Sequence, residues 1–122
     1  MYQRVFIVKE GQWGLMKPEE YESIIKLYKE VLERAEDTKG NKMAEVEVVE
    51  TTKEAVKRAN MEADVVVFIS RGMEEEAEKL ASAYPRIKVV VFTGAIPQGK
   101  VIWVNKACAA GMETIQNIVL RY

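Results

Sequence analysis

The stretch Val65-Val66-Val67-Phe68-Ile69 decides the fold of this chain. It is a continuous run of β-branched and aromatic residues, and the turn-like sequence Ser70-Arg71-Gly72 follows it directly. Short apolar runs of this kind are typical of strands that are buried on both faces of a parallel sheet. We therefore expect this segment to form the central strand of a sheet.

Three further strands are predicted around it. Residues 5–8 and 88–92 are short apolar runs of the same buried type. Residues 44–50 instead alternate, with valines on one face and Glu45 and Glu47 on the other. A strand with one charged face is expected at the margin of the sheet, because such charges discourage pairing at the edge.

Apolar residues recur at helical spacing between these strands. The pattern predicts helices over 18–35, 51–59 and 73–84, and a last helix with Cys108, Met112, Ile115, Val119 and Tyr122 on its inner face. Strands that alternate with helices imply right-handed crossovers and a parallel sheet. We therefore predict a single α/β domain over residues 1–122, of the three-layer flavodoxin-like or Rossmann-like class, with five strands in the order 2-1-3-4-5.

The fifth strand, residues 101–104, leaves two alternatives open. About nine residues separate Thr93 from Trp103, fewer than the dozen or so that a parallel crossover usually needs. Fully extended, they span roughly 30 Å, which is enough for a helix-free parallel crossover. An antiparallel hairpin with the fourth strand is the competing prediction.

The composition excludes several classes of function. The 122 residues carry 18 basic and 19 acidic side chains, for a net charge of −1. This balance lacks the basic excess that a nucleic-acid groove needs. No run approaches the ~18 apolar residues of a membrane span. With one cysteine and no leader pattern we expect a cytoplasmic protein, and the abundance of Glu and Lys is a pattern seen in thermophiles.

Histidine is absent from the chain. Its absence excludes imidazole-based serine and cysteine triads, HExxH metal sites and His-containing zinc clusters. Cys108 cannot build a thiolate metal site alone, and its register with Met112 favours a place in the core. No phosphate-binding glycine motif follows the first strand. We therefore predict no metal and no cofactor, and we favour a protein that is not an enzyme.

A ligand site is expected at the carboxyl ends of the strands, where the strand order reverses. The candidate residues follow the first, third and fourth strands: Lys9, Gly11, Trp13, Ser70, Arg71, Gly72, Thr93 and Gly94. Arg71 and the helix start after Gly72 suit an anion. Three glutamates at 74–76 already occupy that positive helix end, which argues for an ordinary turn instead. Trp13 either stacks on a ligand or folds back over the sheet edge.

Two segments carry a resemblance to a known family. Ala63-Asp64-Val65-Val66-Val67-Phe68 and Ala83-Tyr84-Pro85-Arg86-Ile87-Lys88-Val89-Val90-Val91 resemble one lobe of a type I periplasmic binding protein of the basic-membrane-lipoprotein branch. The likeness runs over nearly the whole chain and includes a short link to the last strand and a helix with Gly111. It implies a parallel fifth strand and the binding of a small solute between two lobes. This sequence provides one lobe.

The functional hypothesis is a non-catalytic, homo-oligomeric domain that binds a small ligand at the strand ends. The last helix motivates a homodimer, because Ile118, Val119, Leu120 and Tyr122 place apolar groups on more than one of its faces. Together with the fifth strand it would form a self-complementary patch. The alternative is an enzyme or nucleotide-binding protein that uses the 9–14 and 70–72 loops. A scaffold that only contacts other proteins is the third possibility.

Overall fold

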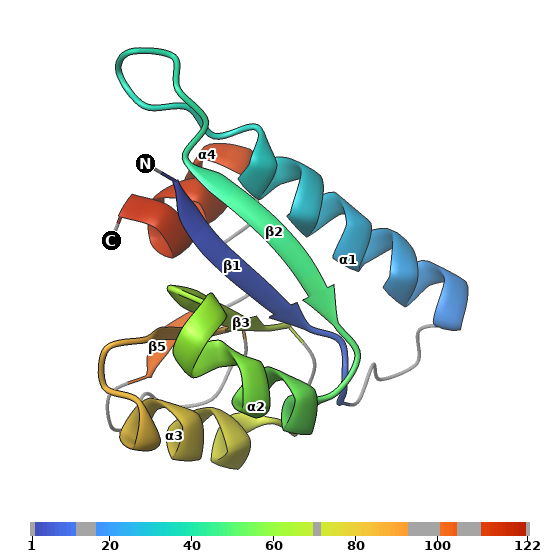
Figure 1. Ribbon diagram of the computed structural model, residues 1–122. Coiled ribbons are helices and arrows are strands. Elements are labelled where there is room, and N and C mark those ends of the chain that lie inside the picture. Colours follow the sequence, from blue (N-terminus) through green and yellow to red (C-terminus); the bar gives the residue numbers. More distant parts are fainter. Residues whose placement is uncertain (1, 12–16, 70–71, 93–100, 105–110, 122) are drawn as a thin grey trace.

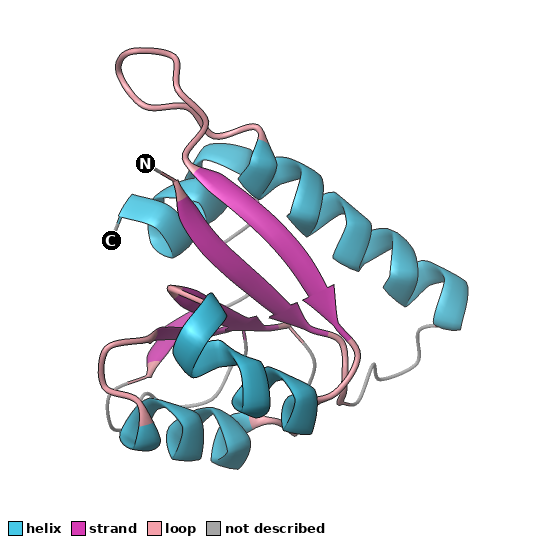
Figure 2. Ribbon diagram, viewed as in Figure 1, coloured by secondary structure: helices cyan, strands magenta, loops and turns pink. Residues whose placement is uncertain are grey.

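The computed structural model describes residues 2–11, 17–69, 72–92, 101–104 and 111–121 (Figure 1). From residue 3 to residue 92 the described strands and helices alternate in sequence order, and a further strand and a C-terminal helical segment follow. A twisted sheet forms the middle layer, and helices cover both of its faces (Figure 2). The prediction of an α/β protein with a parallel, three-layer arrangement is therefore confirmed.

Four strands make up the body of the sheet: β1 (Gln3–Val8), β2 (Ala44–Val49), β3 (Val65–Phe68) and β4 (Lys88–Phe92). They lie in the order β2-β1-β3-β4, and each neighbouring pair is parallel. All four residues of β3 are buried, as expected of a central strand. β2 lies at the margin, with the alternating pattern of exposed glutamates that the sequence predicted.

The fifth predicted strand is present only as a three-residue segment, β5 (Ile102–Val104). It pairs with β4 in parallel, with Ile102 opposite Val90. The sheet thus has four strands of four to six residues, and the fifth strand of the predicted order 2-1-3-4-5 is only this short segment beside β4. The antiparallel hairpin with β4 is not the arrangement found.

One face of the sheet is covered by α1 (Pro18–Glu33) and by the C-terminal segment, which consists of α4 (Met112–Gln116) and a π-helical turn η1 (Asn117–Arg121) (Figure 1). The odd-numbered residues of β1 and β3 point to this side. They pack against apolar residues of both helical segments, namely Tyr21, Ile25, Val31, Leu32, Ile115, Val119 and Leu120.

The opposite face is covered by α2 (Thr52–Glu62) and α3 (Glu74–Ala83) (Figure 1). The even-numbered residues of β1 and β3, including Phe6 and Phe68, point to this side. Alanines of α2 and α3 let the two helices approach the sheet closely, and Leu80 of α3 is buried in the same core. A strand buried on both faces explains why residues 65–68 show no polar alternation.

The last helix differs from its prediction. Its described part begins at Met112, with Gly111 as the N-cap, and Met112 is half exposed, although the sequence placed it on the inner face. Ile115 and Val119 are buried as predicted. Cys108 and Tyr122 lie outside the described residues. None of the helices described is long and apolar enough to cross a membrane.

Candidate functional site

The strand order of the sheet reverses between β1 and β3: β2 is added on one side of β1, and β3 and β4 are added on the other. β1 and β3 are neighbours in the sheet. From β1 the chain passes to α1 on one face, and from β3 it passes to α3 on the other. Two adjacent connections that leave toward opposite faces open a crevice at the strand ends, and this is the usual place for a ligand in open α/β sheets.

A glycine follows each of these strands in a backbone conformation that favours this residue type. Gly11, after β1, has a φ angle of 131°, and Gly72, after β3, has a φ angle of 79°. Side chains with a Cβ atom adopt such angles rarely, because the Cβ meets the backbone. The structure therefore brings two predicted site residues, Gly11 and Gly72, to the ends of neighbouring strands.

Lys9 is held by contacts inside the fold. Its ammonium pairs with Glu22 of α1, and lies 3.6 Å from the Glu50 carboxylate at the end of β2. Its carbonyl accepts a hydrogen bond of 2.9 Å from the Tyr21 hydroxyl. The hydrogen bond that Lys9 donates to Glu22 is the largest of the effects that raise the pKa of Lys9 above the usual lysine value. The predicted ligand contact from Lys9 thus competes with two carboxylates of the protein itself.

Glu10 closes the N-terminus of α2. Its carboxylate accepts a hydrogen bond of 2.9 Å from the backbone N–H of Thr52. The Thr51 side chain accepts from the N–H of Glu54 at 3.1 Å, so two of the free donors of this helix are satisfied. The bond from the Thr52 N–H holds the pKa of Glu10 below the usual glutamate value.

The N-terminus of α3 is different. Met73 is its N-cap and makes no side-chain cap hydrogen bond. The first turn of α3 contains Glu74, Glu75 and Glu76, whose negative charges are stabilised by the positive end of the helix dipole. These carboxylates weaken the predicted attraction of an anion to this helix end.

Five of the eight predicted site residues lie outside the described residues: Trp13, Ser70, Arg71, Thr93 and Gly94. The described members are Lys9, Gly11 and Gly72. Of these, the two glycines follow the neighbouring strands β1 and β3, and the Lys9 ammonium pairs with Glu22 of α1 and lies near Glu50 after β2.

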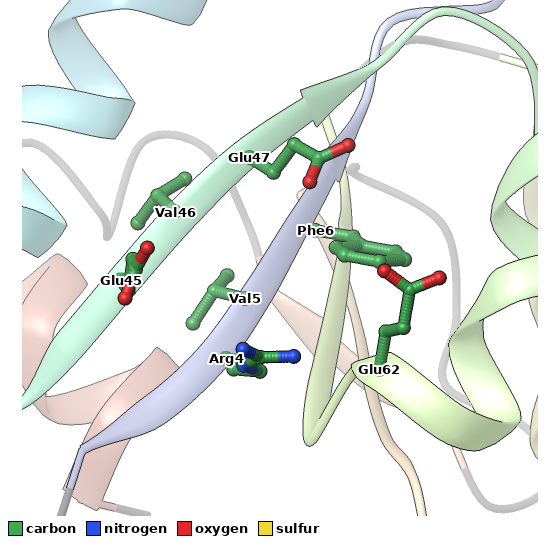
Figure 3. Close-up of a pocket in the computed structure, with 7 residues that line it drawn as sticks. All are labelled: Arg4, Val5, Phe6, Glu45, Val46, Glu47 and Glu62. Carbon is green, nitrogen blue, oxygen red and sulfur yellow. The ribbon is translucent and has the colours of Figure 1, made fainter.

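A pocket of about 270 Å³ lies elsewhere, on the α2 side of β1 and β2 (Figure 3). Its lining is mostly charged and consists of Arg4, Val5, Phe6, Glu45, Val46, Glu47 and Glu62. Sequence reasoning missed this pocket. The signal was the alternation of glutamates in β2, which was interpreted only as a mark of an edge strand.

Arg58 of α2 organises the carboxylates at this pocket. Its guanidinium hydrogen-bonds to Glu47 of β2 and to Glu62 one helical turn further on. The guanidinium also lies over the Phe6 ring, with its central carbon 5.0 Å from the ring centroid. Two of the three carboxylates that line the pocket are therefore already paired with Arg58. These ion pairs serve the packing of α2 against β2, and we interpret the pocket as part of that structural contact.

No group of three or more acidic, cysteine or histidine side chains in the described part of the chain is arranged to hold a metal ion. Comparisons of the chain with models of known protein families, with curated proteins and with solved structures found no match. The resemblance of residues 63–91 to a lobe of type I periplasmic binding proteins therefore stays a prediction.

Proposed function

We propose that this chain is a non-catalytic α/β domain that binds a small ligand in the crevice between the carboxyl ends of β1 and β3. The observation that carries the proposal is the opposite direction of the two connections that follow these strands. Ligands of open α/β sheets collect at such a point because the loops separate there and leave backbone groups accessible.

The glycines support the same place. Gly11 and Gly72 let the backbone approach a ligand without a Cβ between them. The pocket beside β2 is a weaker candidate, because Arg58 already neutralises Glu47 and Glu62 in part. Catalysis is not part of the proposal, since the described charged groups at this edge, Lys9 and Glu10, serve contacts within the fold.

A thermal-shift screen with nucleotides, phosphate esters and sugars tests this function. We expect at least one of these classes to raise the unfolding temperature in a saturable way. The variants Arg71→Ala and Trp13→Ala should weaken that shift, because in the sequence both residues follow the two strands, β1 and β3, whose ends form the proposed site. Arg34→Ala, an exposed arginine at the end of α1, is the matched control and should leave the shift unchanged.

Two outcomes would count against the proposal. The first is a shift that Arg34→Ala and Arg71→Ala reduce equally, since a general charge effect explains it. The second is turnover of a bound phosphate ester, which would favour the alternative of an enzyme that uses the 9–14 and 70–72 loops.

We also propose that the protein forms a homodimer through the C-terminal helix and the fifth strand. Half-exposed Met112 is the apolar group on α4 that remains for such a contact. Val119 and Leu120 are buried by the chain's own core, so they no longer support it. Light scattering at high protein concentration tests the dimer, and a strictly monomeric mass would exclude it. A cytoplasmic location and a thermophilic source stay predictions of the sequence.

A further inference from the structure

β2 is a margin of the sheet, and its outer edge carries backbone groups that β1 does not pair. The N–H of Gln3 donates to the carbonyl of Met43, and the N–H of Lys9 donates to that of Val49. Odd-numbered residues at β2 therefore point their backbone groups toward β1. Because these groups alternate along a parallel strand, those of Ala44, Val46 and Val48 point away from the sheet.

The outward N–H of Val46 has a partner from a different element. It donates a hydrogen bond of 3.3 Å to the carboxylate of Glu33, the last residue of α1. The carboxylate thus takes the place that the carbonyl of an additional strand would occupy. The two partners are 13 positions apart in the sequence, and they are brought together because α1 packs along β2 on the apolar face.

The start of the strand and its exposed face add two observations. Just before β2 the N–H of Met43 donates to the carbonyl of Ala35, and Ala44 is fully buried, so the segment after α1 is held against the start of the strand. Glu45 and Glu47 are exposed on the side away from α1. In an antiparallel pair of two β2 strands these glutamates would face the same residues of the second copy, and like charges oppose each other there.

We propose that Glu33 is a strap that closes the outer edge of β2 against pairing with β2 of a second copy of this chain. An unpaired edge strand is a template for strand addition, and proteins protect such edges with charges or covering groups. Here the protection has two parts. Glu33 occupies the central outward donor, and Glu45 adds a charge that a second strand would have to bury or oppose.

Amide hydrogen exchange measured by NMR at single residues tests the strap. In the unmodified protein the amide hydrogen of Val46 should exchange with solvent more slowly than is usual for an amide that points outward from an edge strand. Glu33→Ala should accelerate that exchange about tenfold, the factor expected for one lost hydrogen bond to a charged acceptor. Glu33→Gln, which keeps an acceptor oxygen, should accelerate it less. Amides of the central strand, such as Val66, should not change and report whether the variants remain folded.

Sedimentation tests the consequence. The double variant Glu33→Ala/Glu45→Thr should show a weight-average mass that rises with concentration more steeply than that of the unmodified protein. Glu30→Ala, an exposed glutamate on the same helix, is the matched control for the loss of one charge from α1. Unchanged exchange at Val46 in Glu33→Ala would overturn the proposal, as would a double variant that sediments like the control.

Discussion

Arg58 on α2 joins the carboxylate of Glu47 on the edge strand β2 through two N–H groups, one of them 2.9 Å from the carboxylate. This bidentate geometry ties α2 to the edge strand β2, beside the apolar contact that Val49 shares with the alanines of α2. The same guanidinium lies over the ring of Phe6 and reaches Glu54 and Glu62 on its own helix. Arg58 thus adds a polar link between α2 and the β1–β2 margin to the apolar packing of Ala55 and Ala59.

Replacement of Arg58 should lower stability in a graded way. We expect Arg58→Ala to lower the unfolding temperature most, and Arg58→Lys to lower it less, because an ammonium cannot form the planar fork that binds two carboxylates. Added salt should reduce the difference between the unmodified protein and Arg58→Ala, since exposed ion pairs are screened. Calorimetry in low and high salt measures both effects. Equal unfolding temperatures for the unmodified protein and Arg58→Lys would show that the fork does not matter.

Glu10 should make part of the stability depend on acid pH. The pKa of Glu10 is lowered in the fold by the Thr52 N–H, so its carboxylate stabilises the folded state above the ordinary glutamate pKa of about 4.3. This contribution is lost as the pH falls below that value toward the lowered pKa. Urea unfolding of Glu10→Gln should therefore show a loss of stability near neutral pH that shrinks at pH 3.

The control for this measurement is Glu20→Gln, an exposed glutamate in the first turn of α1. We expect a smaller loss for it at neutral pH than for Glu10→Gln. If both variants lost the same stability at every pH, the contact between Glu10 and Thr52 would not be the cause.

Two leucines on α1 provide a matched test of the core. Leu32 is fully buried between the helix and the sheet, whereas Leu27 is 57% exposed. Leu32→Ala should lower the free energy of unfolding by about 2–5 kcal/mol, because it leaves a cavity among close-packed neighbours. Leu27→Ala should change it by no more than about 0.5 kcal/mol. Chemical unfolding of the two variants checks the orientation of α1, and a similar cost for both would contradict it.

Lys88 should anchor the C-terminal segment. Its ammonium donates to the carbonyls of Ile118 and Val119 at 2.7 and 3.1 Å, and burial lowers its pKa. Lys88→Met removes both hydrogen bonds that the ammonium donates to the Ile118 and Val119 carbonyls. We expect faster amide exchange in η1, with little change in β3. Lys79→Met, which breaks an exposed pair with Glu75, is the control and should leave η1 unchanged.

The sequence predicted the alternation of strands and helices well, because the period of apolar residues is a local property. Residues 65–68 are buried on both faces, and the mixed valine and glutamate pattern of β2 belongs to a margin, as expected. The last helix was predicted less well. Met112 has the spacing of an inner residue, but the described helix begins there and leaves its side chain half exposed.

The ligand site at the strand ends stays a prediction. Gly11 and Gly72 lie where the strand order suggests, because topology alone brings the ends of β1 and β3 together. The role of Lys9 was not predictable. Its partner Glu22 lies on α1 and Glu50 lies beyond β2, so nothing in the residues next to Lys9 indicates that its charge is already paired.

The sequence by itself determined the class of this protein, the margin position of β2 and the absence of imidazole chemistry, since each depends on residue types and short periods. Tertiary structure alone decided which charges meet. Glu10 reaches Thr52 across 42 residues, and Glu33 reaches the outer edge of β2 only because α1 folds back along it. Contacts of this kind depend on how helices and strands pack against one another. The local periodicity of apolar residues does not predict that packing.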